Sequence, residues 1–238
     1  DDTPGVHARG RKLGAIKNEK SIIVHQSLRT CGGRLVYRGY QSGYAAVYVI
    51  DLASGSRNRI VNFPGTNSGA EFSPDGGRIA LTISKDGNPE LYMVGANGGG
   101  ARRLTHSRGV ESSPTWSPSG DEIIYSFDGT GGPQLYRISA SGGEGRRLAT
   151  GYGYCTEPSW SPDGRRLAFT DGQMLRVVDL TTHEETALFE EPFSEVLNGA
   201  DWSPDGKWLA VAVGTEPRAQ RRWVVVSAHG AGQGVATP

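Results

Sequence analysis

A tetrapeptide, Ser-Pro-Asp-Gly or a near copy of it, recurs four times along the chain and constrains its fold more than any other feature. The copies begin at Ser73, Ser117, Ser161 and Ser203, so they are spaced by 44, 44 and 42 residues. An aromatic residue precedes each copy and an apolar triplet follows it. A period of about 40–50 residues with several short strands is typical of a β-propeller, in which each repeat forms one four-stranded blade. The sequence therefore predicts an all-β fold of stacked blades.

Five repeats can be recognised, the first of them degenerate, and we predict about five four-stranded blades, with six as the alternative. A single domain over residues 1–238 would hold repeats at about 21–63, 64–106, 108–150, 152–190 and 195–238. The last repeat shows only three strands, and Gly10-Arg11-Lys12-Leu13 is similar to the outer-strand segments of other repeats. We expect residues 5–14 to complete the last blade and close the ring, which removes two sheet edges. The alternative is a frayed N-terminal arm.

Composition narrows the classes of partner. The chain has 25 basic and 25 acidic side chains, so it lacks the single-sign field that nucleic acid or an anionic membrane surface would attract. No run of residues is apolar and long enough for a membrane span, and no signal-peptide pattern opens the chain. The two cysteines, Cys31 and Cys155, are too few for a disulfide framework, and we expect two free thiols.

Three runs of sequence bring a family into view: Leu52-Ala53-Ser54-Gly55, the segment 70–76 and the segment 156–164. They resemble the propeller of the TolB family, which acts in the Tol–Pal system of the Gram-negative cell envelope. The resemblance implies a monomeric, non-enzymatic, protein-binding propeller in the periplasm, without a cofactor, in a mature form that lacks its signal peptide. It implies a Pal-like peptidoglycan-associated lipoprotein as partner. Two features depart from the family, which has an N-terminal α/β domain that nothing here can build and six blades where we count five repeats.

The candidate binding site lies in the loops that lead into the innermost strands, because these loops should ring one mouth of the central channel. Polar and tyrosyl side chains on loops held by a rigid scaffold are suited to binding. In the resembled family a Thr-Glu-Pro loop contacts Pal, and Thr156, Glu157 and Pro158 match it. We expect Glu157 to be an exposed central contact, with a purely local role in its own loop as the alternative. The predicted partner-binding residues are Thr66, Asn67, Glu111, Tyr154, Thr156, Glu157 and Asn198.

Catalysis is the competing hypothesis. Four acidic residues, Glu71, Glu111, Glu157 and Asp201, are positioned to face the channel, and a pair of carboxylates suits glycoside hydrolysis. They occupy different depths in their repeats, so we predict no catalytic residue and keep a glycosidase-like hydrolase as the alternative. The five histidines are scattered without metal-binding spacing, and we predict no metal site, although a loosely held channel cation stays an alternative. A structural or engineered propeller scaffold without a ligand is the third possibility.

Overall fold

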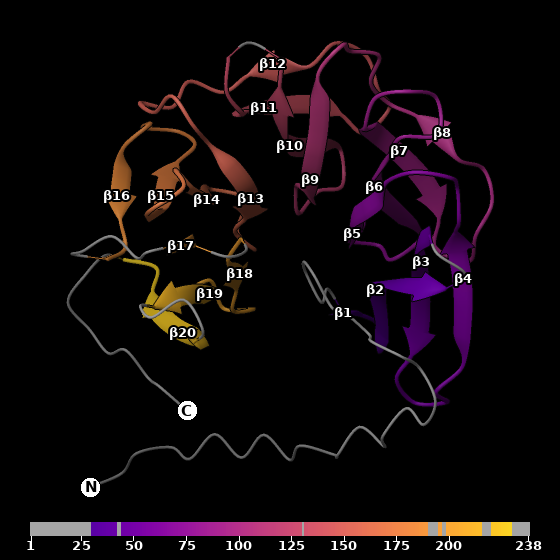
Figure 1. The fold of residues 1–238 in the computed structure, drawn as a ribbon. Helices are drawn as coiled ribbons and strands as arrows, with labels where there is room; N and C mark the ends of the chain where they lie inside the picture. Colours follow the sequence, from indigo (N-terminus) through magenta and orange to yellow (C-terminus); the bar gives the residue numbers. More distant parts are fainter. Residues whose placement is uncertain are drawn as a thin grey trace, which may run out of the picture.

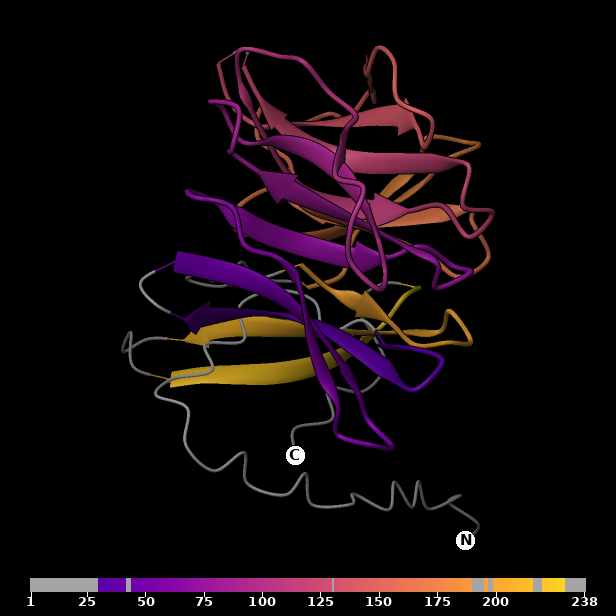
Figure 2. The same ribbon diagram turned by 90° about the vertical axis from the view of Figure 1, so that its right-hand side faces the viewer.

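The strands of this protein form five separate antiparallel sheets (Figure 1). The structure, a computed structural model, describes residues 30–41, 44–129, 131–189, 195–196, 199–215 and 220–229. Within these residues the chain contains strands and no helix, so no helix there crosses a membrane. The sheets lie around a common centre as the blades of a propeller, and Figure 2 shows them from the side. The predicted all-β propeller of five blades is confirmed for the described residues.

The first four blades each contain four strands in sequence order, and the first strand of each lies nearest the centre (Figure 1). Blade 1 consists of β1 (Thr30–Cys31), β2 (Arg34–Gln41), β3 (Tyr44–Asp51) and β4 (Arg57–Val61). Blade 2 consists of β5 (Asn67–Phe72), β6 (Arg78–Ile83), β7 (Glu90–Gly95) and β8 (Arg102–Arg103). Blade 3 consists of β9 (Val110–Trp116), β10 (Glu122–Asp128), β11 (Gln134–Ser139) and β12 (Arg146–Arg147). Blade 4 consists of β13 (Thr156–Trp160), β14 (Arg166–Thr170), β15 (Leu175–Asp179) and β16 (Glu185–Ala187).

Blade 5 is built differently. β17 (Glu195–Val196) and β18 (Asp201–Trp202) both pair with β19 (Trp208–Thr215), which in turn pairs with β20 (Gln220–Ser227). β17 and β18 are two pieces of one inner strand, so the described part of this blade has the three strands that the sequence predicts. The segment predicted to complete it, residues 5–14, lies outside the described residues.

The hydrophobic core is divided into layers between adjacent blades. One cluster joins Val36 of blade 1 to Leu81 of blade 2, and another joins Leu91 of blade 2 to Ile123 of blade 3. Two more clusters connect blade 3 to blade 4 and blade 4 to blade 5. Each blade therefore buries its apolar faces against its neighbours, which is why stacked repeats are stable where a single repeat is not. Cys155 is buried in one of these layers, and both it and Cys31 are free thiols, as predicted.

The recurring tetrapeptide forms a tight turn between the first and second strands of a blade. In blade 2 the Ser73 hydroxyl donates to Asp75 Oδ1 over 2.5 Å and accepts the backbone N–H of Arg78 over 3.0 Å. The same Asp75 oxygen accepts the N–H of Gly77, and Gly76 takes a φ of 67°, which favours glycine. These hydrogen bonds hold the pKa of Asp75 below its usual value. The aspartate of this turn therefore has a structural role.

An arginine at the start of the second strand fastens one blade to the next. Arg78 lies over the Trp116 ring of the following blade, with its Cζ atom 5.0 Å from the ring centroid, and its Nη2 reaches the Gly120 carbonyl at 3.5 Å. Arg34 and Arg166 make the equivalent pair of contacts in their blades, with hydrogen bonds of 2.7 and 2.8 Å. We call this arrangement, made by Arg34, Arg78 and Arg166, the arginine staple.

The third blade lacks the staple because Glu122 occupies the arginine position. Glu122 instead forms an exposed ion pair with Arg137 in its own sheet, 3.5 Å apart. The indole N–H of Trp160, on the next blade, donates to the Gly164 carbonyl of its own turn over 3.0 Å. By contrast, the indole N–H groups of Trp116 and Trp202 donate to backbone carbonyls of the preceding blade. Each of these two rings is also covered by an arginine of that blade. Where the arginine staple is absent, the indole N–H therefore bonds within its own blade and not to the preceding one.

Substitution of Arg78 by Met should lower the free energy of unfolding by about 1–2 kcal/mol, because it removes a cation–π contact and a hydrogen bond but keeps the aliphatic stem. The matched control is Arg137→Met, which breaks an exposed ion pair and should change stability by less than about 1 kcal/mol. Denaturant unfolding of both variants measures the difference. Equal effects of the two substitutions would show that the staple adds nothing to an ordinary surface pair.

Candidate functional site

The loops that lead into the inner strands present only part of the predicted binding site. Thr66 is exposed, and Tyr154 keeps 47% of its surface accessible. Thr156 and Glu157, at the start of β13, are half-buried. Asn198 lies outside the described residues. The exposed part of the predicted site is therefore Thr66 and Tyr154, with Thr156 beside the latter in sequence.

Two of the predicted binding residues are buried instead. Asn67 and Glu111 occupy equivalent positions at the beginning of two inner strands, and each has about 1% or less of its surface exposed. The amide of Asn67 donates to the Ala45 carbonyl of blade 1 over 2.9 Å. The carboxyl of Glu111 accepts from the Thr105 hydroxyl over 3.2 Å. Both side chains therefore fasten an inner strand to the chain that precedes it.

A bulge recurs near the middle of the inner strands. The pairing of β5, β9 and β13 with the neighbouring strand shifts register at the equivalent place in each blade. Gly69, Ser113 and Glu157 stand there with φ of 60°, 52° and 52°. Positive φ is uncommon for serine and glutamate, and such strained backbone persists only where surrounding contacts hold it. The bulges therefore need an explanation in side-chain contacts.

Glu157 supplies that explanation by bridging three blades. Its Oε1 accepts from the Ser113 hydroxyl of blade 3 over 2.9 Å, and its carboxyl accepts the backbone N–H of Gly199 ahead of β18. A Cβ atom on Gly199 would lie 2.9 Å from the Glu157 Cβ, so this close approach requires glycine. Burial raises the pKa of Glu157, and these two hydrogen bonds oppose the shift. The carboxyl therefore makes hydrogen bonds to both neighbouring blades.

A second layer of contacts lines the channel side of the inner strands. Glu71 Oε1 lies 3.4 Å from both the backbone nitrogen of Trp116 and the Thr115 hydroxyl on the next blade. Thr115 repeats this role, because its hydroxyl accepts the backbone N–H of Trp160 over 3.3 Å. Glu71, Glu111 and Glu157 thus sit in three different settings, each bonded to a different neighbour. Among the described residues, no group of three His, Cys, Asp or Glu side chains is arranged to hold a metal ion.

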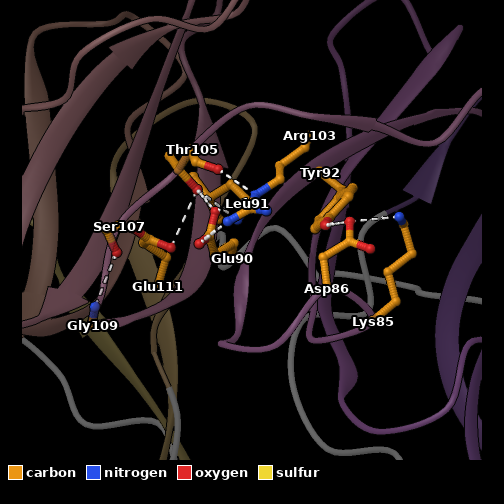
Figure 3. Close-up of polar contacts among 10 residues, drawn as sticks. All are labelled: Lys85, Asp86, Glu90, Leu91, Tyr92, Arg103, Thr105, Ser107, Gly109 and Glu111. Atoms are coloured by element: carbon orange, nitrogen blue, oxygen red, sulfur yellow. Dashed lines mark hydrogen bonds and ion pairs between the residues drawn. The ribbon is translucent and has the colours of Figure 1, made fainter.

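Glu111 belongs to a polar cluster between blades 2 and 3 that sequence reasoning missed (Figure 3). Arg103 grips the buried Glu90 through two nitrogens, with Nε 2.6 Å from Glu90 Oε2, and also donates to the Thr105 carbonyl. Thr105 Oγ1 accepts the backbone N–H of Leu91 and faces both carboxyl groups, at 3.5 Å from Glu90 and 3.2 Å from Glu111. A hydroxyl has one proton to donate, so it serves one of them at a time.

The repeat carries a signal that could have revealed this cluster. Arg147 and Gln134 stand 44 residues after Arg103 and Glu90, and they form the equivalent hydrogen bond over 2.7 Å in blade 3. Glu90 is paired with an arginine, whereas Glu111 has only the hydroxyls of Thr105 and Ser107 as partners in the cluster. Burial raises the pKa of Glu111 to about 7, and the charge of Glu90 adds to this rise against the opposing hydroxyl bonds. Glu111 is therefore a buried carboxyl that changes charge near neutral pH.

A neighbouring cluster lies at the loop between β6 and β7 of blade 2 (Figure 3). The Tyr92 hydroxyl donates to Asp86 Oδ2 over 2.5 Å, and the same carboxylate accepts from Lys85 over 2.6 Å. Burial, followed by the hydrogen bond to Asp86, raises the pKa of Tyr92 to about 12. Lys85 also lies over the Tyr92 ring, 5.2 Å from its centroid. This group is internally satisfied, so it fixes the loop before β7 and offers no free reactive group.

Comparison with known proteins shows which family this chain is similar to. The family model of the TolB beta propeller domain matches residues 7–233. A stretch of 61 residues is 36% identical to the Tol-Pal system protein TolB of Francisella tularensis, and it covers 26% of this chain and 14% of that protein. The crystal structure of TolB from Acinetobacter baumannii superposes with a TM-score of 0.74 at 27% identity, covering 83% of this chain and 50% of that one. The chain thus spans about half of that relative.

More distant structures show the fold alone. A structure assigned to TolB from Agrobacterium tumefaciens superposes with a TM-score of 0.69 at 21% identity, covering 87% of this chain and 76% of that one. Puromycin-hydrolyzing peptidases share the fold at 16% identity. The fold by itself therefore does not decide the function, which has to be argued from the site.

The raised pKa of Glu111 predicts how stability depends on pH. Because the folded protein holds this proton more tightly than the unfolded chain, the contribution of Glu111 to stability is present below about pH 4.5 and is lost as pH rises through about 7. The Glu111→Gln variant should not lose this stability, because the glutamine side chain does not ionise. At about pH 8.5 the free energy of unfolding of the variant should exceed that of the wild type by about 1–2 kcal/mol. This is less than the full pKa shift would give at roughly 1.4 kcal/mol per pKa unit, because water screens part of the effect. At about pH 5 the two should be similar.

Thermal unfolding followed by circular dichroism across this pH range measures the effect. The matched control is Glu144→Gln, which neutralises an exposed carboxyl nearby and should leave the pH profile unchanged. A Glu111→Gln profile that parallels the wild type at every pH would show that Glu111 ionises normally.

Proposed function

The chain belongs to the TolB beta propeller domain family, and we propose that it is a non-enzymatic, protein-binding propeller of the Tol–Pal system that acts in the bacterial periplasm. The observation that carries the proposal is a rigid set of inner strands whose leading loops expose Tyr154 and Thr66. Polar and aromatic groups on loops above a stiff scaffold suit recognition of a folded protein. The proposed partner is a Pal-like peptidoglycan-associated lipoprotein, bound by a monomeric propeller without a cofactor.

The proposed site gives different roles to the residues that the sequence singled out. Tyr154 and Thr66 contact the partner directly, and Thr156 contributes from the half-buried start of β13. Glu157 acts as a positioning residue, because its hydrogen bonds to Ser113 and Gly199 hold the backbone behind Tyr154. Asn67 and Glu111 support the site from beneath through their contacts with the preceding chain. Asn198 is proposed as a further contact to the partner, on the basis of the sequence prediction.

Hydrolysis is less well supported by the arrangement of the carboxyl groups. A glycosidase needs two carboxyls across one bond, about 5–10 Å apart and both free to act on the substrate. Glu71 is bonded to the backbone of Trp116, and Glu157 is bonded to Ser113 and Gly199. Glu111 lies between blades 2 and 3, beside Thr105. The carboxyl groups are therefore used in hydrogen bonds that hold the blades together. This favours a binding function over catalysis, because a catalytic carboxyl must be free to act on the substrate.

Binding of purified, delipidated Pal-like protein tests the proposed function. Tyr154→Ala should weaken binding by about thirtyfold, which corresponds to the roughly 2 kcal/mol that a central aromatic contact contributes, and should leave the melting temperature unchanged. The matched control is Trp208→Ala, which removes a 41% exposed aromatic beside the turn at the opposite end of the inner strands. This control should bind as the wild type does.

Glu157→Ala separates a positioning role from a direct contact. If Glu157 positions the loop, the substitution lowers both the melting temperature and the affinity, whereas a direct contact would lower the affinity alone. The same titration decides between classes of function. Absence of binding by the wild-type chain would overturn the proposed partner and favour a scaffold without this ligand.

A further inference from the structure

A cavity of about 380 Å³ lies beside Glu111, between blade 3 and the segment that connects blade 2 to it. Its walls come from four parts of the chain. The segment after β8 contributes Thr105 and Ser107, β9 contributes Glu111, and β10 and β11 contribute aromatic rings. The segment ahead of β12 closes the outer side with Glu144. A volume of this size lies within the range typical of small-molecule sites.

The aromatic wall is preformed. Tyr125 and Phe127 project from β10 and Tyr136 from β11. The Tyr136 ring packs edge-on against Phe127 with centroids 5.0 Å apart, and it lies 6.0 Å from the Tyr125 ring. Phe127 is paired directly with Glu111 across the strands, so the carboxyl and the rings share one face of blade 3. A Cβ atom on Gly145 would lie 2.1 Å from the Tyr125 hydroxyl, so glycine is required for that wall to close.

The charges around the cavity favour a cation. Glu111 and Glu144 supply two carboxyl groups, and none of the described residues that line the cavity is a lysine or an arginine. Behind this wall, the charge of Arg103 is taken up by Glu90. His106 is the basic side chain of the lining. A buried carboxylate whose protein partners are hydroxyl groups has room for a positively charged partner, whereas an uncharged ligand would leave it unpaired.

We propose that this cavity binds a small organic cation, with an ammonium group against the Glu111 carboxylate and its methyl or methylene groups against the rings of Tyr125, Phe127 and Tyr136. The attraction of an ammonium to aromatic faces strengthens when both are withdrawn from water. The rings also bury the alkyl part of the ligand, which an inorganic cation lacks. The site is separate from the protein-binding face, because Tyr154 and Thr66 are not among the residues that line it.

The proposal makes binding depend on the charge of Glu111. Because burial raises the pKa of Glu111 to about 7, the carboxylate form rises from about one tenth to about nine tenths of the population between pH 6 and 8. The charged groups that face it are Glu90 from β7, Arg103 from β8, His106 from the following segment and Glu144 ahead of β12. Ionisation of Glu111 strengthens the site, so binding becomes stronger at higher pH.

Calorimetric titration of the whole chain with choline tests the proposal, because its quaternary ammonium does not titrate. The neutral analogue 3,3-dimethylbutan-1-ol, which replaces the charged nitrogen by carbon, is the matched ligand control. Choline should bind in the millimolar range or more tightly, about tenfold more strongly at pH 8 than at pH 6, and the alcohol should bind much less. A parallel titration with butylammonium distinguishes a site for quaternary ammonium from one that also accepts primary amines. Equal binding of choline and the alcohol, or no binding of either ammonium ion, would overturn the proposal.

Variants locate the site. Glu111→Gln should reduce choline affinity at pH 8 at least tenfold and abolish most of its pH dependence. Tyr136→Leu should weaken binding several-fold and keep the pH dependence, so it tests the site even if Glu111→Gln were to unfold. Tyr154→Ala, at the protein-binding face, should bind choline as the wild type does. Unchanged choline affinity in both Glu111→Gln and Tyr136→Leu would place any binding elsewhere and contradict the proposal.

Discussion

The contact between an arginine and the aromatic ring of the next blade sets how blades 1, 2 and 4 of this propeller face their neighbours. Hydrophobic layers between blades supply the driving force, but apolar packing is non-directional and does not by itself fix how one sheet faces another. The arginine staple adds direction, because the guanidinium both covers a ring and reaches the glycine carbonyl of the adjacent turn. The recurring turn presents that carbonyl at the same place in each repeat. The turn therefore shapes its own blade and also provides the acceptor that fixes the preceding one.

The inner strands solve a second problem, which is how to hold strained backbone at the channel. Ser113 and Glu157 adopt positive φ where glycine would be easier, and the hydrogen bond between their side chains accounts for the choice. Neighbouring blades are thereby joined at the level of the bulge, close to the loop that exposes Tyr154. A carboxylate that the resemblance marks as a partner contact thus contributes to the stiffness of the scaffold. Stiffness behind a binding loop lowers the entropy lost on association, so a positioning role is compatible with a binding function.

Equivalent positions at the start of the inner strands hold side chains of different chemistry in different blades. Asn67, Glu111 and Cys155 occupy it in successive blades, and all three are buried. Asn67 uses its amide to hold backbone carbonyls, and Cys155 lies 3.2 Å from the Thr150 hydroxyl. Glu111 makes the same kind of contact with Thr105, but it also brings a charge into a cavity with an aromatic wall. A chain that is repetitive in its fold is therefore not repetitive in its polar chemistry.

The sequence by itself determined the fold class, the repeats that form the blades and the three strands of the last repeat, because these follow from local turn chemistry and from the spacing of apolar residues. The choice of five blades over six came from the structure. Of the aromatic residues that precede the recurring turn, Trp116 and Trp160 are buried and Trp202 is half-buried. Only the tertiary structure decided the settings of the acidic residues. Glu111 and Glu157 stand in loops and strand ends where the sequence suggests exposure, yet their partners come from other elements, some of them 44 residues away. Periodicity reports which face of a strand a residue occupies, but the direction of a side chain across a blade interface depends on bulges and on the neighbouring sheet.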